Sequence, residues 1–482
     1  MAKNGATYQQ GDLILSEDPW VYTVLSGEVD FRCYHCLRLL ASADSSSPLL
    51  NKGNRCSACK YARYCSVECQ KKDWKERHKA ECFMLKLGGA SSVRPPVHFL
   101  LMLKILNKLK TNFDDLMSSK SPSSLQKKRK TRTYIDLVSH AEELWNTPGI
   151  MEYITQVRIM LGKYLAIEND AELPYVQDVL QMFGKIKCNG FGITDDSMSS
   201  CGVGIYLEGS ALDHSCSPNA CQVFQGPRLT IRATKAIHGG MKNVRIAYID
   251  VFVPKEVRLK RLMDGYLFEC TCPRCLDDTQ QKDAEMFSIK CESPKCALAV
   301  PSDERAEAPC KCGHKPKNGE VRLDRYDLLL EELLQRVDRF DQEGVGCEFD
   351  EKQWKEDETF LHRMEDLLHP NNPLLACFYS MMGRMLLSWG CETAPQYFAK
   401  AAYIYRVWMP APAVDPVMGY AFLQAVERDP AVGEPLDSFK RLIEAEKILR
   451  FTHSKDHSLY REAHAALRLA AITVNKICSR NV

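Results

Sequence analysis

Cysteine constrains this chain more than any other residue, because 22 of its 482 residues are cysteines and most of them lie in short clusters. Seven occur from Cys33 to Cys82, four at 188–221, three at 270–275 and four at 291–312. The first 15 residues hold one lysine and no apolar stretch before a small-residue cleavage site, so we expect no secretion signal. Inside a cell thiols stay reduced, and clustered cysteines are metal ligands more often than disulfides.

The composition excludes several classes of protein. A chain with 45% hydrophobic and 26% charged residues can bury a large core, which argues against collagen-like and disordered proteins. The 64 Lys and Arg residues nearly balance 62 Asp and Glu residues, so any attraction to nucleic acid or membranes has to be local. The apolar run from Val97 to Leu106 is interrupted by Lys104 and is much shorter than the roughly 20 residues that span a bilayer, so we expect no transmembrane helix.

Residue patterns divide the chain into segments of different secondary structure. Alternation from Asp12 to Thr23 predicts short strands, and the glycine-interrupted runs from Gly190 to Asp250 predict a small multi-strand unit. The polar stretch 110–132, with a basic run at 127–130, predicts an exposed loop, and a nuclear-import or anion-binding patch is the alternative. Helical spacing recurs in three further parts of the chain, namely 97–109, 135–183 and 323–482.

The last third of the chain contains paired helical segments separated by prolines. Their spacing is typical of helix hairpins stacked side by side, as in TPR-like arrays, and a generic helical bundle is the alternative. The segments are 373–391, 394–408, 417–427, 437–451 and 458–477.

The first cysteine cluster supplies eight ligands in closely spaced pairs. Two tetrahedral zinc ions need that number, and interleaved pairs cross-link a segment that is too small to build its own core. Eight unrelated buried side chains are the alternative explanation. The pairs are Cys33-x2-Cys36, Cys56-x2-Cys59, Cys65-x3-Cys69 and His78-x3-Cys82.

Two further groups of cysteines have the spacing of metal ligands. Cys270, Cys272 and Cys275 supply three thiolates, and Cys216 in the sequence LDHSCSPNA is our candidate for the fourth. A catalytic zinc ion with bound water in the open position is the alternative. A small zinc ribbon is predicted for two pairs nearer the C-terminus, with unliganded thiols as the alternative: Cys291-x4-Cys296 and Cys310-x-Cys312.

Several motifs together resemble a known family. The stretch KYARYCSVECQKKDWKERHKAEC at residues 60–82 resembles a MYND zinc finger. The motifs CNGF, CGVGIY, GSALDHSCSPN, VRIAYID and YLFECTCPRC resemble, in that order, the SET domain and post-SET segment of the SET-and-MYND (SMYD) family of protein-lysine methyltransferases. By this resemblance one zinc ion is shared by Cys33, Cys36, Cys65 and Cys69, and another by Cys56, Cys59, His78 and Cys82.

The resemblance implies an α+β fold with a helical C-terminal domain. It predicts the N-terminal part of a SET domain, an inserted MYND finger, a helical insert with a basic loop near 120–132, the SET core, a post-SET zinc segment, a zinc-ribbon insert and a TPR-like helical domain. In that order these regions are 1–32, 33–82, 83–187, 188–253, 254–280, 281–322 and 323–482.

The resemblance also implies methyl transfer from S-adenosylmethionine to a lysine of a histone or another protein. Such transfer needs a neutral amine, which desolvation favours, and a narrow aromatic channel in which the amine and the methyl donor meet in line. Tyr248 and Tyr266 are the implied catalytic residues, and Phe268 would stack on the adenine. The implied cofactor-binding residues are Cys188, Asn189, Ser210, Leu212, Asp213, His214, Tyr248 and Phe268, with Tyr134 and His140 from a helical segment. Asn219 ends the same motif as His214.

Three positions depart from the family pattern. The GxG turn that opens the family's SET domain has only Lys3-Asn4-Gly5 in its place, Asp213 replaces an asparagine, and the usual GEE turn reads HGGMKNV at 238–244. A second function class therefore stays open, namely a catalytically impaired scaffold that binds proline-containing or other peptides in transcriptional regulation.

The resemblance further implies the partners and the location of the chain. We expect a protein or histone lysine as the substrate, proline-containing peptides at the finger, and weak DNA contact through a finger that holds eight Lys or Arg and four Asp or Glu between Arg55 and Cys82. We expect a monomer without membrane contact, located in the cytoplasm and the nucleus.

Overall fold

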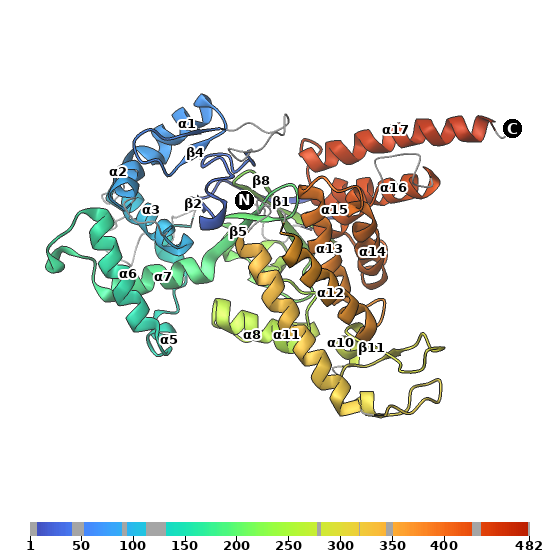
Figure 1. Cartoon of the computed structure of the whole chain (residues 1–482). Helices are drawn as coiled ribbons and strands as arrows, with labels where there is room; N and C mark the ends of the chain where they lie inside the picture. Colours follow the sequence, from blue (N-terminus) through green and yellow to red (C-terminus); the bar gives the residue numbers. More distant parts are fainter. Residues whose placement is uncertain are drawn as a thin grey trace.

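The structure is a computed structural model, and small β-sheets lie at its centre with helices on both sides (Figure 1). This mixture confirms the predicted α+β class. Among the described residues, none of the helices combines the length and the apolarity that crossing a membrane requires. The described residues are 7–40, 53–88, 94–111, 132–276, 281–317, 319–343, 350–426 and 435–480.

Two three-stranded sheets join the N-terminal segment to residues far along the chain. β6 lies so close to β2 that a Cβ atom at Gly202 would be 2.7 Å from the carbonyl oxygen of Thr23, so glycine alone fits there. One sheet has the order β1 (Leu13–Glu17), β9 (Arg228–Ala233), β8 (Ala220–Gln225), and the other has the order β2 (Val21–Val24), β6 (Ser200–Ile205), β5 (Gly190–Thr194). A short parallel pair consists of β7 (Asp213–His214) and β10 (Arg245–Ile246).

The finger segment is a small hairpin followed by two helical pieces. The hydroxyl of Ser66 accepts a hydrogen bond from the backbone N–H of Cys69 and so caps the first helix, which fixes the short loop between Cys65 and Cys69. Asp73, which is fully buried, accepts a hydrogen bond from the Tyr64 hydroxyl. The elements are β3 (Asn54–Arg55), β4 (Arg63–Tyr64), α1 (Val67–Asp73), the π-helix η2 (Trp74–His78) and α2 (Lys79–Gly88).

A helical unit follows the finger and packs around α3, which is buried from Phe99 to Leu103. A helix with apolar residues on nearly every face belongs inside a protein core. The helices predicted at 97–109 and 135–183 are confirmed, and the basic run at 127–130 lies outside the described residues. The helices are α3 (Val97–Thr111), α5 (Ala141–Trp145), α6 (Ile150–Leu165) and α7 (Val176–Asn189).

Short elements lead from the sheets to the helical C-terminal domain. They are α8 (Lys255–Tyr266), α9 (Pro273–Leu276), α10 (Gln281–Met286), β11 (Ile289–Lys290) and β12 (Ala299–Val300). The domain itself contains α11 (Gly319–Glu343), α12 (Glu351–Leu367), α13 (Pro373–Ser388), α14 (Ala394–Trp408), α15 (Pro416–Gln424), α16 (Pro435–Thr452) and α17 (Ser458–Arg480).

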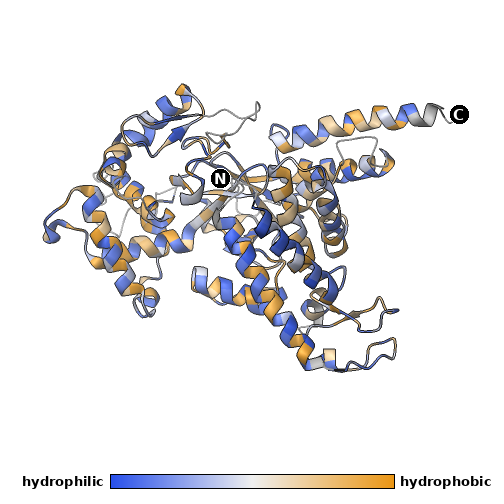
Figure 2. Ribbon diagram, in the orientation of Figure 1, coloured by the Kyte–Doolittle hydropathy of each residue, from blue (hydrophilic) through white to orange (hydrophobic). Residues whose placement is uncertain are grey.

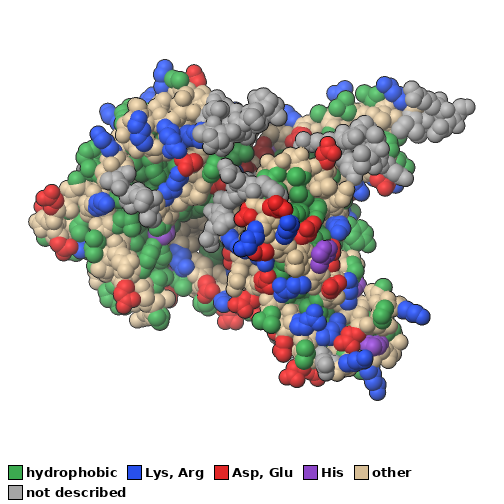
Figure 3. Space-filling model, viewed as in Figure 1, with side chains coloured by type: hydrophobic (Ala, Val, Ile, Leu, Met, Phe, Trp, Pro, Cys, Tyr) green, Lys and Arg blue, Asp and Glu red, His purple; other side chains and the backbone are tan. Residues whose placement is uncertain are grey.

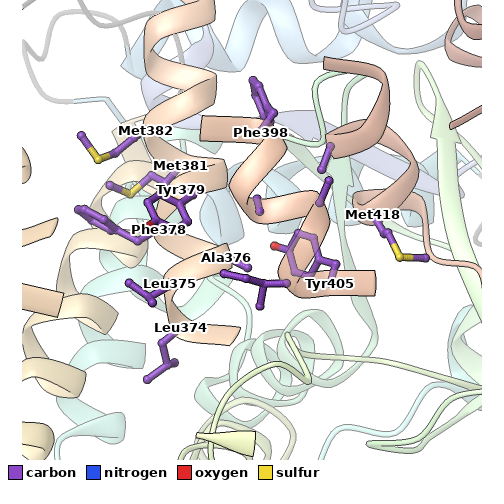
Figure 4. Close-up of a cluster of buried hydrophobic side chains, with 14 of the residues drawn as sticks. Leu374, Leu375, Ala376, Phe378, Tyr379, Met381, Met382, Phe398, Tyr405 and Met418 are labelled. Atoms are coloured by element: carbon purple, nitrogen blue, oxygen red, sulfur yellow. The ribbon is translucent and has the colours of Figure 1, made fainter. Parts of the chain in front are cut away.

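Each helix from α13 to α17 packs against the next, which confirms the predicted series of paired helices. The first turns of α13 and α15 are favoured by local sequence. Asn372 and Asp415 cap these helices with their side chains, and a proline follows each cap. Figure 4 shows part of the shared core, to which α13 contributes Phe378 and Met382 and α14 contributes Phe398. Apolar and polar residues alternate along α17, as Figure 2 shows.

Candidate functional site

The finger brings its eight predicted ligands together in two sets of four. The first set is Cys33, Cys36, Cys65 and Cys69, and the second is Cys56, Cys59, His78 and Cys82; within each set the ligand atoms lie within 4.8 Å of one another. The Sγ atoms of Cys36 and Cys65 are 3.7 Å apart, as are those of Cys56 and Cys82. A tetrahedral zinc ion with Zn–S bonds of about 2.3 Å separates its sulfur ligands by roughly 3.8 Å, so both sets fit zinc.

The third set joins two distant parts of the chain. Cys216 lies with Cys270, Cys272 and Cys275, and its Sγ is 3.9 Å from that of Cys270 and 3.5 Å from that of Cys275. Four thiolates close a tetrahedral site and leave no position for water. This arrangement favours a structural zinc ion over the catalytic ion that the three-cysteine motif left open.

His214 connects the third set to the predicted catalytic tyrosine. The backbone N–H of Tyr248 donates to His214 Nδ1 at 3.0 Å, and His214 Nε2 lies 3.2 Å from Cys216 Sγ. Because Nδ1 accepts a hydrogen bond, the ring proton is on Nε2 and points at the sulfur. Burial, and next the charge of Arg258, lower the pKa of His214 to about 4, so the ring is neutral.

An open pocket lies beside this histidine, with about 360 Å³ of empty space when the adjoining solvent is included. The ring centroids of Tyr248 and Tyr266 are 4.8 Å apart at its wall. The hydroxyl of Tyr248 donates to the carbonyl of Leu212 at 2.5 Å, and that of Tyr266 donates to the carbonyl of Tyr248 at 3.1 Å. Burial raises the pKa of Tyr266 to about 12 and that of Tyr248 further, so both phenols stay protonated. The lining residues are Cys188, Asn189, Gly190, Phe191, Gly192, Ser210, Gln222, Ala247, Tyr248 and Tyr266.

Other predicted cofactor residues border the pocket or lie away from it. The ring of Phe268 is 6.1 Å from His214 and 6.3 Å from Tyr248, so it lies beside the tyrosine. Tyr134 stacks on Trp20 with ring centroids 5.0 Å apart, and His140 contacts Glu143; neither Tyr134 nor His140 lines the pocket.

The structure supplies hydrogen bonds where the sequence departs from the family pattern. The side chain of Asp213 is 72% exposed and lies 3.5 Å from Arg245. The turn at 238–244 is closed by the side chain of Asn243, which donates to the carbonyl of His238, and by that of Asn219, which donates to the carbonyl of Asn243. Residues 1–6, where the GxG turn is expected, lie outside the described residues.

Several pocket residues were missed in the sequence. Phe191 was visible as the last residue of CNGF, but nothing in the motif indicated that it lines the pocket. Gln222 lies on β8, and no local pattern marks it because its neighbours read as an ordinary strand. The strand pairing of β8 with β9 turns this glutamine into the pocket, and such long-range pairing is not encoded in local sequence.

The fourth set of predicted ligands also comes together. The Sγ atoms of Cys291 and Cys312 are 3.7 Å apart, and those of Cys296 and Cys310 are 3.8 Å apart. Cys291 and Cys296 lie in the loop that joins β11 to β12, and Cys310 and Cys312 follow β12, which is an arrangement expected of a small ribbon.

Comparison with known proteins shows which chains share these features. A family model described as "MYND finger" matches residues 33–82. The histone-lysine N-methyltransferase SMYD3 of Mus musculus is 35% identical over 285 residues, which cover 59% of this chain and 60% of that protein. The N-lysine methyltransferase SMYD2 of Mus musculus is 31% identical over 296 residues, covering 61% of each chain.

A longer alignment reaches into the helical domain. The N-lysine methyltransferase SMYD2-B of Danio rerio is 26% identical over 466 residues, which cover 96% of this chain and 93% of that protein. The alignments to the SMYD3 proteins of Mus musculus and Homo sapiens, by contrast, span about three fifths of those relatives' length, at 60% and 59%. The chain thus contains a MYND finger, and it is similar to SET-and-MYND methyltransferases in its remaining motifs and along most of its length.

Proposed function

We propose that this chain is an S-adenosylmethionine-dependent protein-lysine N-methyltransferase that acts on histones or other proteins. The observation that carries the proposal is the open pocket in which Tyr248 and Tyr266 stand beside Cys188 and Asn189. Relatives with 31–35% identity are named histone-lysine or N-lysine methyltransferases, which supports it.

The pocket suits the cofactor in shape and in chemistry. When bound, S-adenosylmethionine supplies an electrophilic methyl group on a positively charged sulfur. Backbone can approach it closely along β5, because a Cβ atom at Gly192 would meet nothing within 4 Å. We assign Cys188, Asn189, Ser210, Leu212, Asp213 and His214 to its binding and Phe268 to its adenine, whereas Tyr134 and His140 would act only from a distance.

The two tyrosines would prepare the lysine rather than exchange protons with it. Both phenols are protonated and donate to carbonyl groups, so their oxygens are free to accept from an amine. Burial among aromatic rings favours the neutral form of a lysine, which loses its proton to water on the way in. Held in this way, the nitrogen lone pair points along one line toward the methyl donor.

The remaining parts of the proposal concern metals and partners. We assign one structural zinc ion to each of the two finger sets and one to the set that contains Cys216. Proline-containing peptides would bind the finger, where the ring of Trp74 is 43% exposed. Lys and Arg side chains gather at the upper left of Figure 3. Exposed lysines near Trp74, such as Lys71 and Lys75, would give weak DNA contact. We further propose a monomer located in the cytoplasm and the nucleus.

Calorimetry and a transfer assay test the proposal together. We expect the wild-type protein to release heat on binding S-adenosylmethionine and to transfer radiolabelled methyl groups to a histone mixture. Tyr248→Phe should keep cofactor binding and lose transfer by about 10²-fold. Tyr175→Phe is the matched control, because Tyr175 is 77% exposed. The proposal is wrong if the cofactor gives no heat at millimolar concentration or if Tyr248→Phe transfers as fast as wild type.

A further inference from the structure

We propose that Cys291, Cys296, Cys310 and Cys312 bind a fourth zinc ion and that this zinc ribbon fastens the helical C-terminal domain to the SET core. All four sulfur atoms lie within 4.8 Å of one another, with the 3.7 and 3.8 Å separations given above. A tetrahedral zinc ion needs roughly 3.8 Å between sulfurs, whereas a disulfide needs about 2.05 Å. The geometry is therefore that of a metal site.

The ribbon has almost no apolar core that could fold it without a metal. Among the residues from 291 to 317 whose side chains the structure describes, three are buried, namely Cys291, Val300 and Ala306. Its two strands are two residues long each. Segments of this size hold a fixed shape when a metal ion or disulfide cross-links them.

One side of the ribbon is attached to the corner between α12 and α13. The fully buried Asn372 donates from Nδ2 to the carbonyl of Ser288 at 2.9 Å, and the backbone N–H of His369 donates to the same carbonyl at 3.1 Å. Ile289 forms a β-bridge with Leu368. The contacts use backbone groups of the ribbon, so they require the ribbon to keep one conformation.

The other side is attached to the SET core next to the third zinc site. Asp283 of α10 accepts from Arg258 at 2.6 Å and from Arg274 at 3.1 Å. Arg274 lies between Cys272 and Cys275 and also donates to the carbonyl of Val251 at 2.7 Å. Figure 1 shows α10 and β11 at the foot of α11–α13, where such a fastening would set the position of the helical domain.

Zinc content and hydrogen exchange test the ribbon. Wild-type protein should hold four zinc ions per chain by elemental mass spectrometry, and the double variant Cys296→Ser/Cys310→Ser should hold three. Amide exchange at residues 365–372 should rise about tenfold in the double variant. Cys391→Ser is the control, because Cys391 is exposed and belongs to none of the four sets. Three zinc ions in the wild type, or four in the double variant, would overturn the metal site.

A second variant tests whether the ribbon holds the corner between α12 and α13 while the zinc site stays intact. This test is valid even if the double variant fails to fold. Asn372→Asp keeps the Oδ1 that caps Leu374 but removes the N–H donated to Ser288. We expect four zinc ions and exchange at 365–372 that is again faster by about tenfold. Asn371→Asp, which makes the same chemical change one residue earlier, should leave exchange unchanged. Equal exchange in the two variants would show that the ribbon does not hold this corner.

An independent observation concerns Gln222 in the pocket. Its Oε1 is buried and has no hydrogen-bond partner among the described residues, although Tyr248 and Tyr266 line the same pocket. A buried acceptor without a donor is costly, so such a group calls for a ligand that donates. We infer that Gln222 accepts a hydrogen bond from the target lysine amine and disfavours the third methylation, an inference that rests on the proposed function.

The chemistry of successive transfers gives this selectivity. In each step the nitrogen lone pair forms a bond to the methyl carbon, and the sulfur–carbon bond breaks with its electrons on sulfur. After the first and second transfers the nitrogen loses one proton to water, whereas the third transfer leaves a quaternary ammonium that has no proton to lose. The neutral amine of unmodified lysine has two N–H bonds, that of monomethyllysine has one and that of dimethyllysine has none. A dimethylated lysine would therefore leave Gln222 unpaired in the complex that precedes the third transfer.

Mass spectrometry of the products tests the role of Gln222. Wild-type protein should stop at dimethyllysine, whereas Gln222→Leu should make trimethyllysine at least a tenth of the product and raise KM for the first transfer about tenfold. Gln225→Leu is the control, because Gln225 lies on the same strand and is exposed. The inference is wrong if Gln222→Leu gives the wild-type product pattern. If none of the proteins methylates, the proposed function fails, and this inference fails with it.

Discussion

Arg258 shows how charge is arranged around the third zinc site. Its side chain is completely buried, and burying a guanidinium group costs several kcal/mol unless partners compensate. Arg258 donates to Asp283 at 2.6 Å and to the carbonyl of Val253 at 2.7 Å. Burial would lower the pKa of Arg258, but Asp283 and the Cys216 thiolate together raise it above its ordinary value. A zinc ion with four thiolates carries a net negative charge, which this arginine offsets.

We predict that Arg258→Met destabilises the protein by about 3–5 kcal/mol, because it leaves Asp283 and the zinc site without their buried cation. Urea unfolding measures the free energy, and transfer of zinc to a chromogenic chelator should be faster in the variant. Arg261→Met on the same helix is the control: its pair with Asp338 is at the surface and is worth about 0–1 kcal/mol. An equal decrease in the free energy of unfolding in Arg258→Met and Arg261→Met would contradict this account of Arg258.

The helix α7 carries Cys188 and Asn189 to the pocket and is held against the segment before α5. Asn189 Nδ2 donates to the carbonyl of Val138 at 2.8 Å. A Cβ atom at Gly184 would lie 1.9 Å from the carbonyl oxygen of Ser139, so helix and segment touch where glycine has no side chain. The position of one wall of the pocket thus depends on a glycine one turn away from it.

Gly184→Ala should therefore lower the free energy of unfolding, whereas replacing glycine with alanine in a helix usually raises it. Alanine in a helix normally stabilises by about 0.5–1 kcal/mol, but here the clash with Ser139 should give a net loss of about 1–3 kcal/mol. Urea unfolding of Gly184→Ala and Gly265→Ala compares the two cases. A Cβ atom at Gly265 of α8 would meet nothing within 4 Å, so that variant should gain stability. A gain in both variants would show that α7 can move away from the segment.

The elements that could be predicted from the sequence are those that a pattern of a few neighbouring residues determines. Closely spaced cysteine pairs indicated the ligands of the finger and of the ribbon, because a chelating pair needs a short loop. The caps Asn372 and Asp415, each followed by proline, mark the starts of α13 and α15 for the same local reason. The ligand Cys216 could be assigned to the third set only through its motif, since 54 residues separate it from Cys270.

Contacts that depend on long-range pairing were not predictable. β2 pairs with β6, although the finger and the helical insert separate the two strands in the sequence. Nothing in the β2 sequence VYTV indicates that β6 is its partner. Tyr134 was expected near the cofactor but stacks on Trp20, a contact that only the packing of α3 and α7 determines. Gln222 entered the pocket in the same way, through strand pairing rather than through a motif.

On the scale of the whole molecule, the helical domain is attached to the central sheets at a second place besides the ribbon. Gln10 Nε2 donates to the carbonyl of Pro412 at 2.8 Å, and His457 Nε2 lies 3.0 Å from the carbonyl of Phe224 on β8. α16 also packs on β9. Two attachments at separate points resist rotation better than one, so the domain and the sheets should move as a unit.

The second attachment contains a buried histidine that should make it sensitive to acid. Burial, and next the charges of His457 and Arg232, lower the pKa of His453 to about 3. Its ring is 4.4 Å from that of His457, and Arg232 is also close enough for its charge to oppose protonation of His453. In the unfolded chain His453 takes up a proton near pH 6.5, roughly the ordinary pKa of histidine, and in the folded chain it does not. The stability contributed by neutral His453 is therefore complete above about pH 6.5 and is lost as the pH falls toward 3.

We predict that the free energy of unfolding falls between pH 6 and 4 by up to roughly 1.4 kcal/mol per pH unit more in wild type than in His453→Gln. Urea unfolding at each pH measures the difference. Burial raises the pKa of Asp415 to about 6, which acts in the opposite direction, but both proteins contain Asp415 and its effect cancels. His362→Gln, at a side chain that is 73% exposed, should retain the wild-type slope. Parallel curves for wild type and His453→Gln would mean that the interface opens to admit the proton, and that the two domains are less firmly joined than their contacts indicate.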